Sequence, residues 1–384
     1  IYLNHEGPLV IKKVGVQLYV ASKNILITGG GTGGHLFPAL AIGEEIQRRM
    51  PEAKIHYVGS LFGLESKVFP IKDVWHTLLP IRGFHRGFSV TSIIRNIILP
   101  FRIVKSLIKT NKILKEFKPE VVIGTGGYAS AIPLYMVSKK NDSTTIILQE
   151  QNSFPGITTR LFANKANKIC IAFEEPNHAL GDNTVVTGNP VRKGIGDGNK
   201  RNGLHEFRFE EENKTIFLFG GSQGSAYLNR MISEVAEKIS NGGIQLLWQT
   251  GDLEFQKYNH LESKNIRIVP FVNNMADAYA ISDLIVCRSG ALTLAEITVC
   301  GKPSILIPFQ FAAGDHQKKN AESLVKHNAA HILDEKTLTP KLLLHNIMNL
   351  IHNEDKLEKM GNSSSDLGRP FATNTIVDHI LEKS

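Results

Sequence analysis

Short apolar runs alternate with longer segments of mixed polarity along this chain from residue 24 onward. The first half contains the runs Asn24–Thr28, Lys54–Val58, Val121–Gly124 and Thr145–Gln149. The second half contains Thr215–Phe219, Gln245–Trp248, Arg267–Val269, Leu284–Cys287 and Ser304–Ile307. Apolar runs of this length, separated by helical segments, are typical of parallel strands that helices cover on both faces. The pattern predicts an α/β protein.

The pattern starts twice, because each half opens with a strand, a glycine cluster and a helix. Gly29–Gly34 precedes a helix predicted over about Pro38–Met50, and Gly220–Gly224 precedes one predicted over Tyr227–Ile239. The chain has 384 residues, which is too many for one ordinary hydrophobic core. We therefore expect two Rossmann-like, doubly wound domains that face one another across a cleft. The charged stretch Lys193–Lys214 reads as a linker or surface loop.

Composition narrows the class of protein. An apolar fraction of 42% and a charged fraction of 21% describe a folded chain and exclude a disordered or collagen-like one. Cys170, Cys287 and Cys300 are scattered and odd in number, which argues against a disulfide framework or a cysteine-ligated zinc site and favours a reducing cytoplasm. No apolar stretch approaches the roughly 18–20 residues that a membrane span needs.

The net charge of +8 is unevenly distributed along the chain. Residues 1–190 hold 22 lysines and arginines against 13 acidic residues, whereas residues 191–384 hold 22 against 23. Between Arg82 and Lys118 nine basic residues face only Glu116. Such a cluster indicates an anionic partner, either a nucleic acid or a membrane surface.

The first glycine cluster fits an anion-binding loop. Gly29, Gly31 and Gly34 match G-x-G-x-x-G between a strand and a helix, where free N–H groups and the helix dipole attract an anion. A NAD site would add an acid at the end of the second strand, but His56–Ser60 contains none, and His35 stands where a P-loop needs lysine. For a single loop, the alternative interpretation is a tight turn that binds no ligand. The chain contains two further glycine loops of the same kind, Gly124–Tyr128 and Gly220–Gly224, which disfavours that alternative.

His35 follows the first loop at the carboxyl end of a strand. A neutral imidazole there can accept a proton near physiological pH, so His35 is a candidate general base. The alternative is a surface or capping histidine.

Eight stretches in order resemble the MurG family of peptidoglycan N-acetylglucosaminyltransferases: Gly30–Ala39, Gly126–Ser130, Glu150–Asn152, Gly188–Arg192, Gly220–Gly224, Cys287–Glu296, Pro308–Gln310 and Asp315–Gln317. They cover roughly Asn24 to Glu322. The resemblance implies a GT-B fold and an inverting transfer from UDP-N-acetylglucosamine (UDP-GlcNAc) to lipid I, the undecaprenyl-diphospho-muramoyl-pentapeptide, which forms lipid II.

The resemblance also implies a division of the chain. Residues 24–189, joined by about 369–384, would form an acceptor- and membrane-binding domain, and residues 190–368 a UDP-sugar donor domain. A last helix over about Phe371–Lys383 would cross back to the first domain. Residues 1–23 would be an extension.

Roles for individual residues follow from the same resemblance. His35 would be the catalytic base. The donor would be bound by Thr32, Gly33, Asn152, Arg192, Ser222, Gln223, Phe271, Val272, Met275, Ala291, Leu292, Thr293, Glu296, His316 and Gln317. The acceptor diphosphate would be bound by Gly31, Thr32, Gly33, Gly34, Gly126, Gly127 and Tyr128.

Within this set, Arg192 would supply charge to the diphosphate, Glu296 would bind the ribose hydroxyls, and Phe271 with Val272 and Met275 would form the uracil pocket. The sequence leaves alternatives: an interdomain salt bridge for Arg192, core packing for the uracil set, and a sugar-binding or structural role for Glu150. One position departs from the family, which often has histidine where this chain has Gln149. The chain contains no Asp-x-Asp, so we expect no metal and no cofactor.

The lipid acceptor calls for a membrane-binding surface. Apolar residues recur at helical spacing between Ile93 and Ile108, and basic residues recur on another face, which predicts an amphipathic helix with a kink at Pro100. Membrane binding is predicted for Arg82, Phe84, Arg86, Phe88, Arg102, Lys105, Lys109 and Lys112. A core-facing apolar stripe is the alternative.

These features predict a peripheral enzyme at the cytoplasmic face of the plasma membrane, with a cell-wall or division complex as a candidate partner. Competing hypotheses are another GT-B enzyme that uses a UDP-sugar, such as a lipid glycosyltransferase or an epimerase, and a non-catalytic nucleotide-sugar-binding subunit. A nucleic-acid partner is not expected, because no recognisable binding motif accompanies the basic residues.

Overall fold

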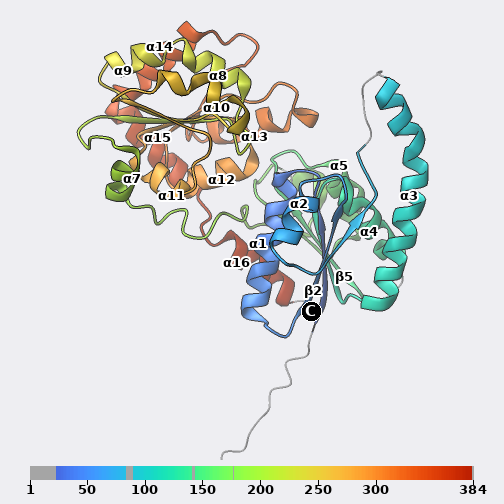
Figure 1. Ribbon diagram of the computed structural model, residues 1–384. Helices are drawn as coiled ribbons and strands as arrows, with labels where there is room; N and C mark the ends of the chain where they lie inside the picture. The colour runs from blue at the N-terminus through green and yellow to red at the C-terminus, as the bar shows by residue number, and fades with distance from the viewer. Residues whose placement is uncertain (1–22, 84–89, 141–142, 176, 383–384) are drawn as a thin grey trace, which may run out of the picture.

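Two parallel β-sheets, each covered by helices on both faces, build two lobes (Figure 1). The structure is a computed structural model and describes residues 23–83, 90–140, 143–175 and 177–382. Every strand pairing recorded within the two sheets is parallel, as the apolar runs predict. The prediction of two doubly wound α/β units is confirmed.

The first lobe contains seven strands in the order β3-β2-β1-β4-β5-β6-β7. The strands are β1 (Asn24–Gly29), β2 (Lys54–Ser60), β3 (His76–Leu79), β4 (Val121–Gly126), β5 (Thr145–Glu150), β6 (Lys168–Ile171) and β7 (Thr184–Val186). The helices that follow them are α1 (Gly33–Arg49), α2 (Glu65–Ile71), α3 (Val90–Phe117), α4 (Tyr128–Ser138), α5 (Ile157–Phe162) and α6 (Asn177–Leu180). From β1 the following strands are added toward one edge of the sheet as far as β3, and from β4 onward toward the other edge. The switch point between β1 and β4 is where such folds bind ligands.

The second lobe contains six strands in the order β10-β9-β8-β11-β12-β13. They are β8 (Thr215–Phe219), β9 (Gln245–Gln249), β10 (Ile266–Val269), β11 (Leu284–Cys287), β12 (Ser304–Leu306) and β13 (His331–Ile332). Its helices are α7 (Lys200–Phe207), α8 (Ala226–Ser233), α9 (Ala236–Asn241), α10 (Asp252–Tyr258), α11 (Met275–Ile281), α12 (Ala291–Val299), α13 (His316–Lys326), α14 (Pro340–Ile351) and α15 (Glu354–Asp366). The corresponding switch point of this sheet lies between β8 and β11, so each lobe has one switch point at which a ligand can bind.

The final helix, α16 (Ala372–Leu381), returns to the first lobe and packs against α1 (Figure 1). Ile376, Val377 and Ile380 are buried in the same core as Ile25 and Ile27 of β1. Arg49 of α1 forms an ion pair with Asp378, and Asn374 donates a hydrogen bond to Glu45. The chain therefore crosses between the lobes twice.

Three sequence predictions need correction. The helix after the first glycine loop begins at Gly33 instead of Pro38, so His35 lies in its first turn. The segment Tyr227–Ile239 is two helices, because Val235 leaves the helical conformation at φ −127°. The stretch Lys193–Lys214 is more than a linker, since it contains α7, whose Phe207 is buried in the core of the second lobe.

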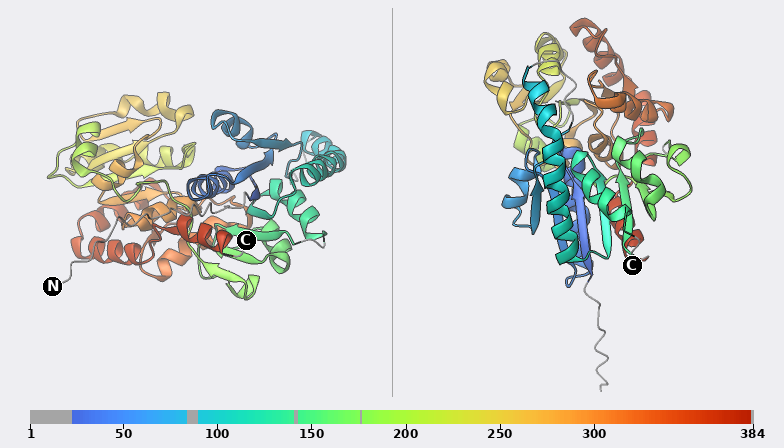
Figure 2. Two further views of the ribbon diagram at one scale, coloured as in Figure 1. Left: turned by 90° about the horizontal axis from the view of Figure 1, so that it is seen from below. Right: turned by 90° about the vertical axis from the view of Figure 1, so that its right-hand side faces the viewer.

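α3 stands on the outer side of the first lobe, away from the second lobe (Figures 1 and 2). The helix continues through Pro100. Its last turns are anchored in the core by Ile113, Leu114 and Phe117. Within the described residues, no helix combines the length and apolarity that crossing a bilayer requires.

Candidate functional site

The first glycine loop joins β1 to α1 and is hydrogen-bonded to a buried carboxylate. Glu65, on α2, is fully buried and accepts hydrogen bonds from the backbone N–H of Gly31 (3.0 Å) and of Ser60 (2.7 Å). Gly30 and Gly31 adopt φ values of 149° and 95°, which favour glycine. The N–H of Gly31 thus donates to Glu65, and Thr32, the N-cap residue before α1, makes no side-chain capping hydrogen bond. The first N–H groups of α1 face out of the helix, where an anion can accept from them.

The second glycine loop, at the start of α4, packs directly against the first. A Cβ atom at Gly127 would lie 2.1 Å from the carbonyl oxygen of Gly30, and one at Gly126 would lie 2.9 Å from His35 Nδ1. The ring of Tyr128 packs on Gly31 in the same way. Burial raises the pKa of the Tyr128 phenol. The two predicted acceptor loops therefore form one surface, and they can do so only as glycines.

His35 is half-buried between these loops, and its Nδ1 has two partners. It lies 3.0 Å from the carbonyl oxygen of Thr125 and 2.8 Å from Oε1 of Gln151. Thr125 Oγ1 donates back to the carbonyl of His35, which fixes the start of α1 against β4. The ring is held by one nitrogen, and the described residues place no hydrogen-bond partner on the other.

The second lobe contributes a further glycine loop, between β8 and α8. Gly221 and Gly224 have φ values of 95° and 74°, and the predicted residues Ser222 and Gln223 between them are exposed. Gln249, buried at the end of β9, donates to the carbonyl of Gly221 and accepts from the N–H of Val272. One side chain thus sets the spacing between the glycine loop and the segment predicted to bind uracil.

α12 carries the predicted ribose ligand. Gly290 caps the helix without a side-chain hydrogen bond, so the N–H groups at Ala291, Leu292 and Thr293 are available to an anion. One turn further on, Glu296 is buried and pairs with Arg192 at 3.0 Å. Tyr279 donates to the other carboxylate oxygen at 3.2 Å. Burial raises the pKa of the Glu296 carboxyl, and the charge of Arg192 and the Tyr279 hydrogen bond oppose that rise.

The structure brings Arg192 and Glu296 together in an ion pair, but both residues lie within the predicted donor domain 190–368, so this is not the interdomain salt bridge considered for Arg192. The side chains predicted to bind the diphosphate and the ribose are therefore bonded to each other in this structure. Half of the Arg192 side chain is exposed, and it can turn toward a bound diphosphate.

The predicted uracil residues divide into two groups. Val272 and Met275 are buried in the hydrophobic core of the second lobe, which is the packing role that the sequence left open. Phe271 is 40% exposed and offers its ring to a ligand. A base can stack on Phe271.

The predicted sugar ligand Asn152 lies where the lobes touch. Asn320 of α13 accepts from the N–H and Oγ of Ser153 and donates to Oδ1 of Asn152 (3.2 Å) and to the carbonyl of Ser289. Glu150 is fully engaged within the first lobe, where it accepts from Asn152, Gly156 and Thr159. Its contacts are the structural role that the sequence left open.

His316 and Gln317 lie at the start of α13. His316 Nδ1 lies 2.8 Å from the carbonyl of Ala313, and Gln317 Oε1 accepts from the N–H of Phe309. Both side chains are half-buried beside the loop that connects β12 to α13. Their remaining polar atoms are the ones open to a sugar.

Comparison with known proteins decides the family. Residues 25–171 match the glycosyltransferase family 28 N-terminal domain, and residues 215–376 match the glycosyltransferase family 28 C-terminal domain. This chain belongs to glycosyltransferase family 28.

Relatives within family 28 agree closely. The chain is 38% identical over 364 residues to the UDP-N-acetylglucosamine--N-acetylmuramyl-(pentapeptide) pyrophosphoryl-undecaprenol N-acetylglucosamine transferase of Christiangramia forsetii, covering 93% of this chain and 96% of that one. The Bacillus subtilis protein of the same name is 38% identical over 354 residues, covering 91% and 96%. A crystal structure of MurG from Acinetobacter baumannii superimposes with a TM-score of 0.75 at 26% identity, covering 94% and 99%. The resemblance to the MurG family and the GT-B fold are confirmed.

The predicted membrane residues of this family 28 chain lie on and beside α3. The side chain of Phe101 is 75% exposed, and Ile97, Val104 and Ile108 are each more than half exposed. This part of the apolar stripe therefore does not face the core. Arg82 and Arg102 both stack on the exposed ring of Phe62, with Cζ atoms 3.8 Å and 4.7 Å from its centroid. Lys105, Lys109 and Lys112 follow along α3. Phe84, Arg86 and Phe88 lie outside the described residues.

Several residues that build the site were not predicted. Gln151, Asn189 and Arg288 lie inside the motif stretches, but the roles predicted from the sequence were assigned to neighbouring residues instead. Arg288 forms a buried ion pair with Glu335 (2.8 Å) and donates to Ser225 and to the carbonyls of Ile307 and Pro308. Glu65, Gln249, Asn320 and Glu335 have no signal in the sequence, because only the fold brings them to the loops.

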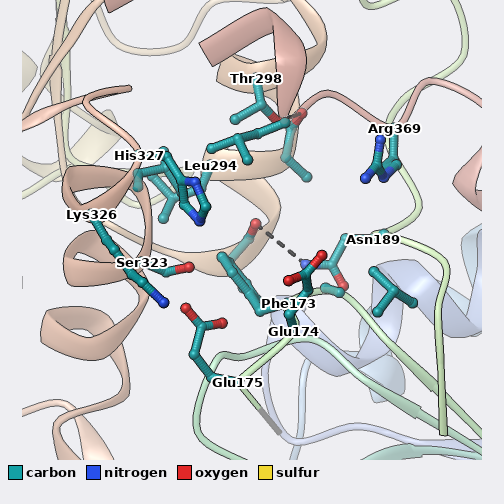
Figure 3. Close-up of a pocket in the computed structure, with 17 residues that line it drawn as sticks. Phe173, Glu174, Glu175, Asn189, Leu294, Thr298, Ser323, Lys326, His327 and Arg369 are labelled. Atoms are coloured by element: carbon teal, nitrogen blue, oxygen red, sulfur yellow. Dashed lines mark hydrogen bonds between the residues drawn. The ribbon is translucent and has the colours of Figure 1, made fainter. Parts of the chain in front are cut away.

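A separate cavity of about 370 Å³ lies between the lobes, behind the face of α12 that carries Leu294 and Thr298. In the view of Figure 3, Lys326 and His327 lie on one side of the cavity, Arg369 lies on the opposite side near Asn189, and Glu174 and Glu175 of the first lobe lie between them. It is distinct from the surface formed by Arg192 and Glu296. Among the described residues, no group of His, Cys, Asp and Glu side chains is placed to hold a metal ion.

Proposed function

We propose that this chain transfers N-acetylglucosamine from UDP-GlcNAc to lipid I with inversion at the sugar, which forms lipid II for peptidoglycan synthesis. The observation that carries the proposal is the 38% identity, over 93% of the chain, to a transferase whose name states this donor and this acceptor. An epimerase would share the fold, but a UDP-N-acetylglucosamine 2-epimerase of Listeria monocytogenes is only 13% identical, which speaks for the fold alone.

His35 acts as the general base in this proposal. It removes the proton from the acceptor hydroxyl as that oxygen attacks the anomeric carbon of the donor from the face opposite UDP. A new C–O bond forms, the bond to the diphosphate oxygen breaks, and UDP leaves with the electron pair. Held by Thr125 and Gln151 at Nδ1, the imidazole keeps Nε2 for the proton. A positioned base is worth roughly 10²–10⁴-fold in rate.

The leaving diphosphate gains negative charge, and the second lobe offers donors to stabilise it. These are the loop at Ser222 and Gln223, the uncapped start of α12 at Ala291, Leu292 and Thr293, and the guanidinium of Arg192. Stabilisation by N–H groups and arginine replaces the metal that many glycosyltransferases use. We therefore propose that the reaction needs no divalent cation and no cofactor.

The remaining donor groups orient the nucleotide and the sugar. Glu296 accepts from the ribose hydroxyls, and Phe271 stacks on uracil while Val272 and Met275 support it from the core. Asn152, His316 and Gln317 hydrogen-bond the sugar. Thr32 and Gly33, at the start of α1, reach the donor from the opposite lobe.

The acceptor diphosphate binds where the two loops of the first lobe meet. Thr32, Gly33 and Gly34 present N–H groups at the start of α1, and Gly126, Gly127 and Tyr128 form the facing edge. Gly31 contributes by its conformation, because Glu65 already accepts its N–H. Two glycine loops pressed together leave room for a diphosphate where side chains would fill the space.

The lipid tail requires a membrane, and the exposed apolar and basic face of α3 supports a peripheral position at the cytoplasmic face of the plasma membrane. Arg82, Arg102, Lys105, Lys109 and Lys112 would meet anionic headgroups, each contributing about 1 kcal/mol near the surface. Phe84, Arg86 and Phe88 are proposed to extend this surface. A cell-wall or division complex is a further proposed partner at the same membrane.

The experiment is a transfer assay with purified protein, UDP-GlcNAc and a lipid I analogue, run with EDTA. We expect a disaccharide product at the rate seen with added Mg²⁺. Release of UDP without transfer, or epimerisation of the donor, would refute the assignment for protein that is folded and binds UDP. A strict requirement for a divalent metal would refute the metal-free mechanism alone.

A further inference from the structure

We propose that Gln151 is a positioning residue that holds the neutral imidazole of His35 as the Nδ1–H tautomer, through a one-way chain of buried amides that ends on the donor lobe. The inference rests on the proposed function, in which His35 is the base. It adds how that base is prepared and which contact joins its support to the second lobe.

The chain has four links. His35 Nδ1 contacts Gln151 Oε1 at 2.8 Å, and Gln151 Nε2 donates to Gln149 Oε1. Gln149 Nε2 donates to Asn189 Oδ1 at 2.9 Å. Asn189 Nδ2 donates to the backbone carbonyl of Ala291, the first residue of α12, at 3.4 Å, and to the carbonyl of Gln151 at 2.9 Å. The three amide side chains are each at most 2% exposed, so the chain is shielded from water.

The direction of donation is set at the far end. The carbonyl of Ala291 can only accept, so Asn189 must present its NH₂ group there and its oxygen to Gln149. Gln149 must then present its oxygen to Gln151, and Gln151 its oxygen to His35. The imidazole nitrogen that meets this oxygen must carry the proton.

Independent contacts agree with this direction. Gln151 Nε2 also lies 2.8 Å from the carbonyl of Thr125 and 3.1 Å from that of Gln149, both of which only accept. A reversed Gln151 amide would point its oxygen at these two carbonyls. His35 Nδ1 itself lies 3.0 Å from the Thr125 carbonyl, which again requires N–H at Nδ1.

The consequence is a base with its lone pair on Nε2, the nitrogen on the far side of the ring from the chain. The charged and titratable groups around the loops are engaged elsewhere. Glu150 accepts from Asn152, Gly156 and Thr159, and Glu65 accepts from Gly31 and Ser60. Tyr128 packs on Gly31. The tautomer therefore depends on neutral amides, so no carboxylate has to accompany the histidine.

The chain also couples the two lobes. His35, Gln149 and Gln151 belong to the first lobe, whereas Ala291 begins the helix that carries Glu296. The link from Asn189 to Ala291 is the longest of the chain at 3.4 Å. A movement of α12 away from the first lobe breaks this link, while the bonds of Asn189 and Gln151 to carbonyls of the first lobe keep the amides oriented.

The first test observes the tautomer directly. The protein is labelled with ¹⁵N-histidine, and long-range ¹H–¹⁵N correlation spectra are recorded at a pH where the imidazole is neutral, with the His35 signals assigned from their loss in His35→Gln. We expect the pattern of a protonated Nδ1 and a bare Nε2. The Nε2–H pattern for the intact protein would overturn the inference.

The second test removes the link by Gln151→Leu. In the variant only the Thr125 carbonyl still accepts from Nδ1, so the fraction of the Nε2–H form, which free histidine prefers, should rise above that of the intact protein. We expect kcat to fall about tenfold or more, within the roughly 10²–10⁴-fold that a positioned base supplies, while the KM for UDP-GlcNAc changes by less than about twofold. An unchanged kcat and an unchanged spectrum would overturn the inference.

Gln245→Leu is the matched control. Gln245 is a glutamine that is equally buried, with bonds to Glu210, Asn213 and Thr215 at the opposite end of the second sheet. It should lower the melting temperature without changing the His35 spectrum or kcat. If His35→Ala leaves turnover intact, the proposed base is wrong even where the tautomer is as expected, so the two failures are distinguishable.

Discussion

At the scale of single residues, the site depends on close approach more than on charge. Gly127 lies so near the carbonyl of Gly30 that any side chain would force the two loops apart. Glu65 then fixes the first loop by accepting from Gly31, and His35 is seated against the second loop. The candidate base is consequently positioned by neighbours that are themselves tightly constrained.

His35→Ala tests the base at this scale. We expect kcat to fall by about 10²–10⁴-fold, because the acceptor hydroxyl loses its proton acceptor, while affinity for UDP stays nearly unchanged. Steady-state kinetics with isothermal titration of UDP checks both quantities. Turnover equal to that of the unmodified protein would remove His35 from the mechanism.

His56 makes a second prediction, about stability. It is buried on β2, stacked on Trp75 with ring centroids 4.5 Å apart, and edge-on to Phe117. Burial lowers its pKa to about 4, with a smaller contribution from His76. The folded protein therefore keeps His56 neutral, while the unfolded chain binds a proton below the ordinary value of about 6.5. Its stabilising contribution is complete above pH of about 6.5 and is lost as the pH falls toward 4.

His56→Phe keeps the aromatic stack and removes this titration. We expect the variant to lose less stability than the unmodified protein between pH 7 and pH 4, by about 2 kcal/mol once solvent screening is allowed for. Urea unfolding at each pH measures the difference. His352→Gln, at an exposed histidine, should show no such difference, and parallel curves for His56→Phe would refute the pKa argument.

At the scale of elements, the apolar runs predicted every strand of five or more residues but only some of the shorter ones. β1, β2, β4, β5 and β8 lie where the apolar runs are, because a buried parallel strand must be apolar on both faces. β3, β6, β7 and β13 have two to four residues and were not predicted, whereas β10, β11 and β12, with three or four residues, were. α7 was taken for a loop because its charged residues conceal the few side chains, such as Phe207, that it buries.

α3 carries the prediction that belongs to this scale. Replacing Arg102, Lys105, Lys109 and Lys112 with Gln removes four charges that each contribute about 1 kcal/mol near anionic lipid, so vesicle binding should weaken by about tenfold to a thousandfold. Sedimentation with phosphatidylglycerol vesicles measures the change.

The control for this experiment takes four exposed lysines of the second lobe, Lys238, Lys341, Lys356 and Lys359, to Gln. It removes the same charge far from α3. Equal weakening by both sets would mean that net charge governs binding, and no weakening by the α3 set would mean that this face has another purpose.

At the scale of the whole molecule, the lobes are held together by few and specific contacts. Asn320, which is fully buried, bonds Ser153 and Asn152 of the first lobe, and α16 returns from the second lobe to α1. The candidate donor and acceptor groups come from both lobes. Their relative placement therefore depends on these contacts.

Asn320→Ala should leave the buried N–H of Ser153 without a partner and cost about 1–3 kcal/mol of stability. We also expect a higher KM for UDP-GlcNAc, because Asn152 loses its partner across the cleft. Denaturant unfolding and donor titration measure the two effects. Asn229→Ala, which removes a buried asparagine wholly within the second lobe, should cost stability without raising that KM; equal KM effects would contradict a role specific to the cleft.

The sequence by itself determined that there are two parallel α/β units, that glycine loops end their strands, and that the motifs belong to the MurG family. Those properties follow from local rules, since the period of apolar residues and the conformational freedom of glycine are written in consecutive positions. Only the tertiary structure decided which distant side chains complete the site. Glu65 under Gly31, Arg192 against Glu296, and the amides that join His35 to Ala291 meet because the fold brings strand ends and two lobes to one place, and no pattern along the chain records that meeting.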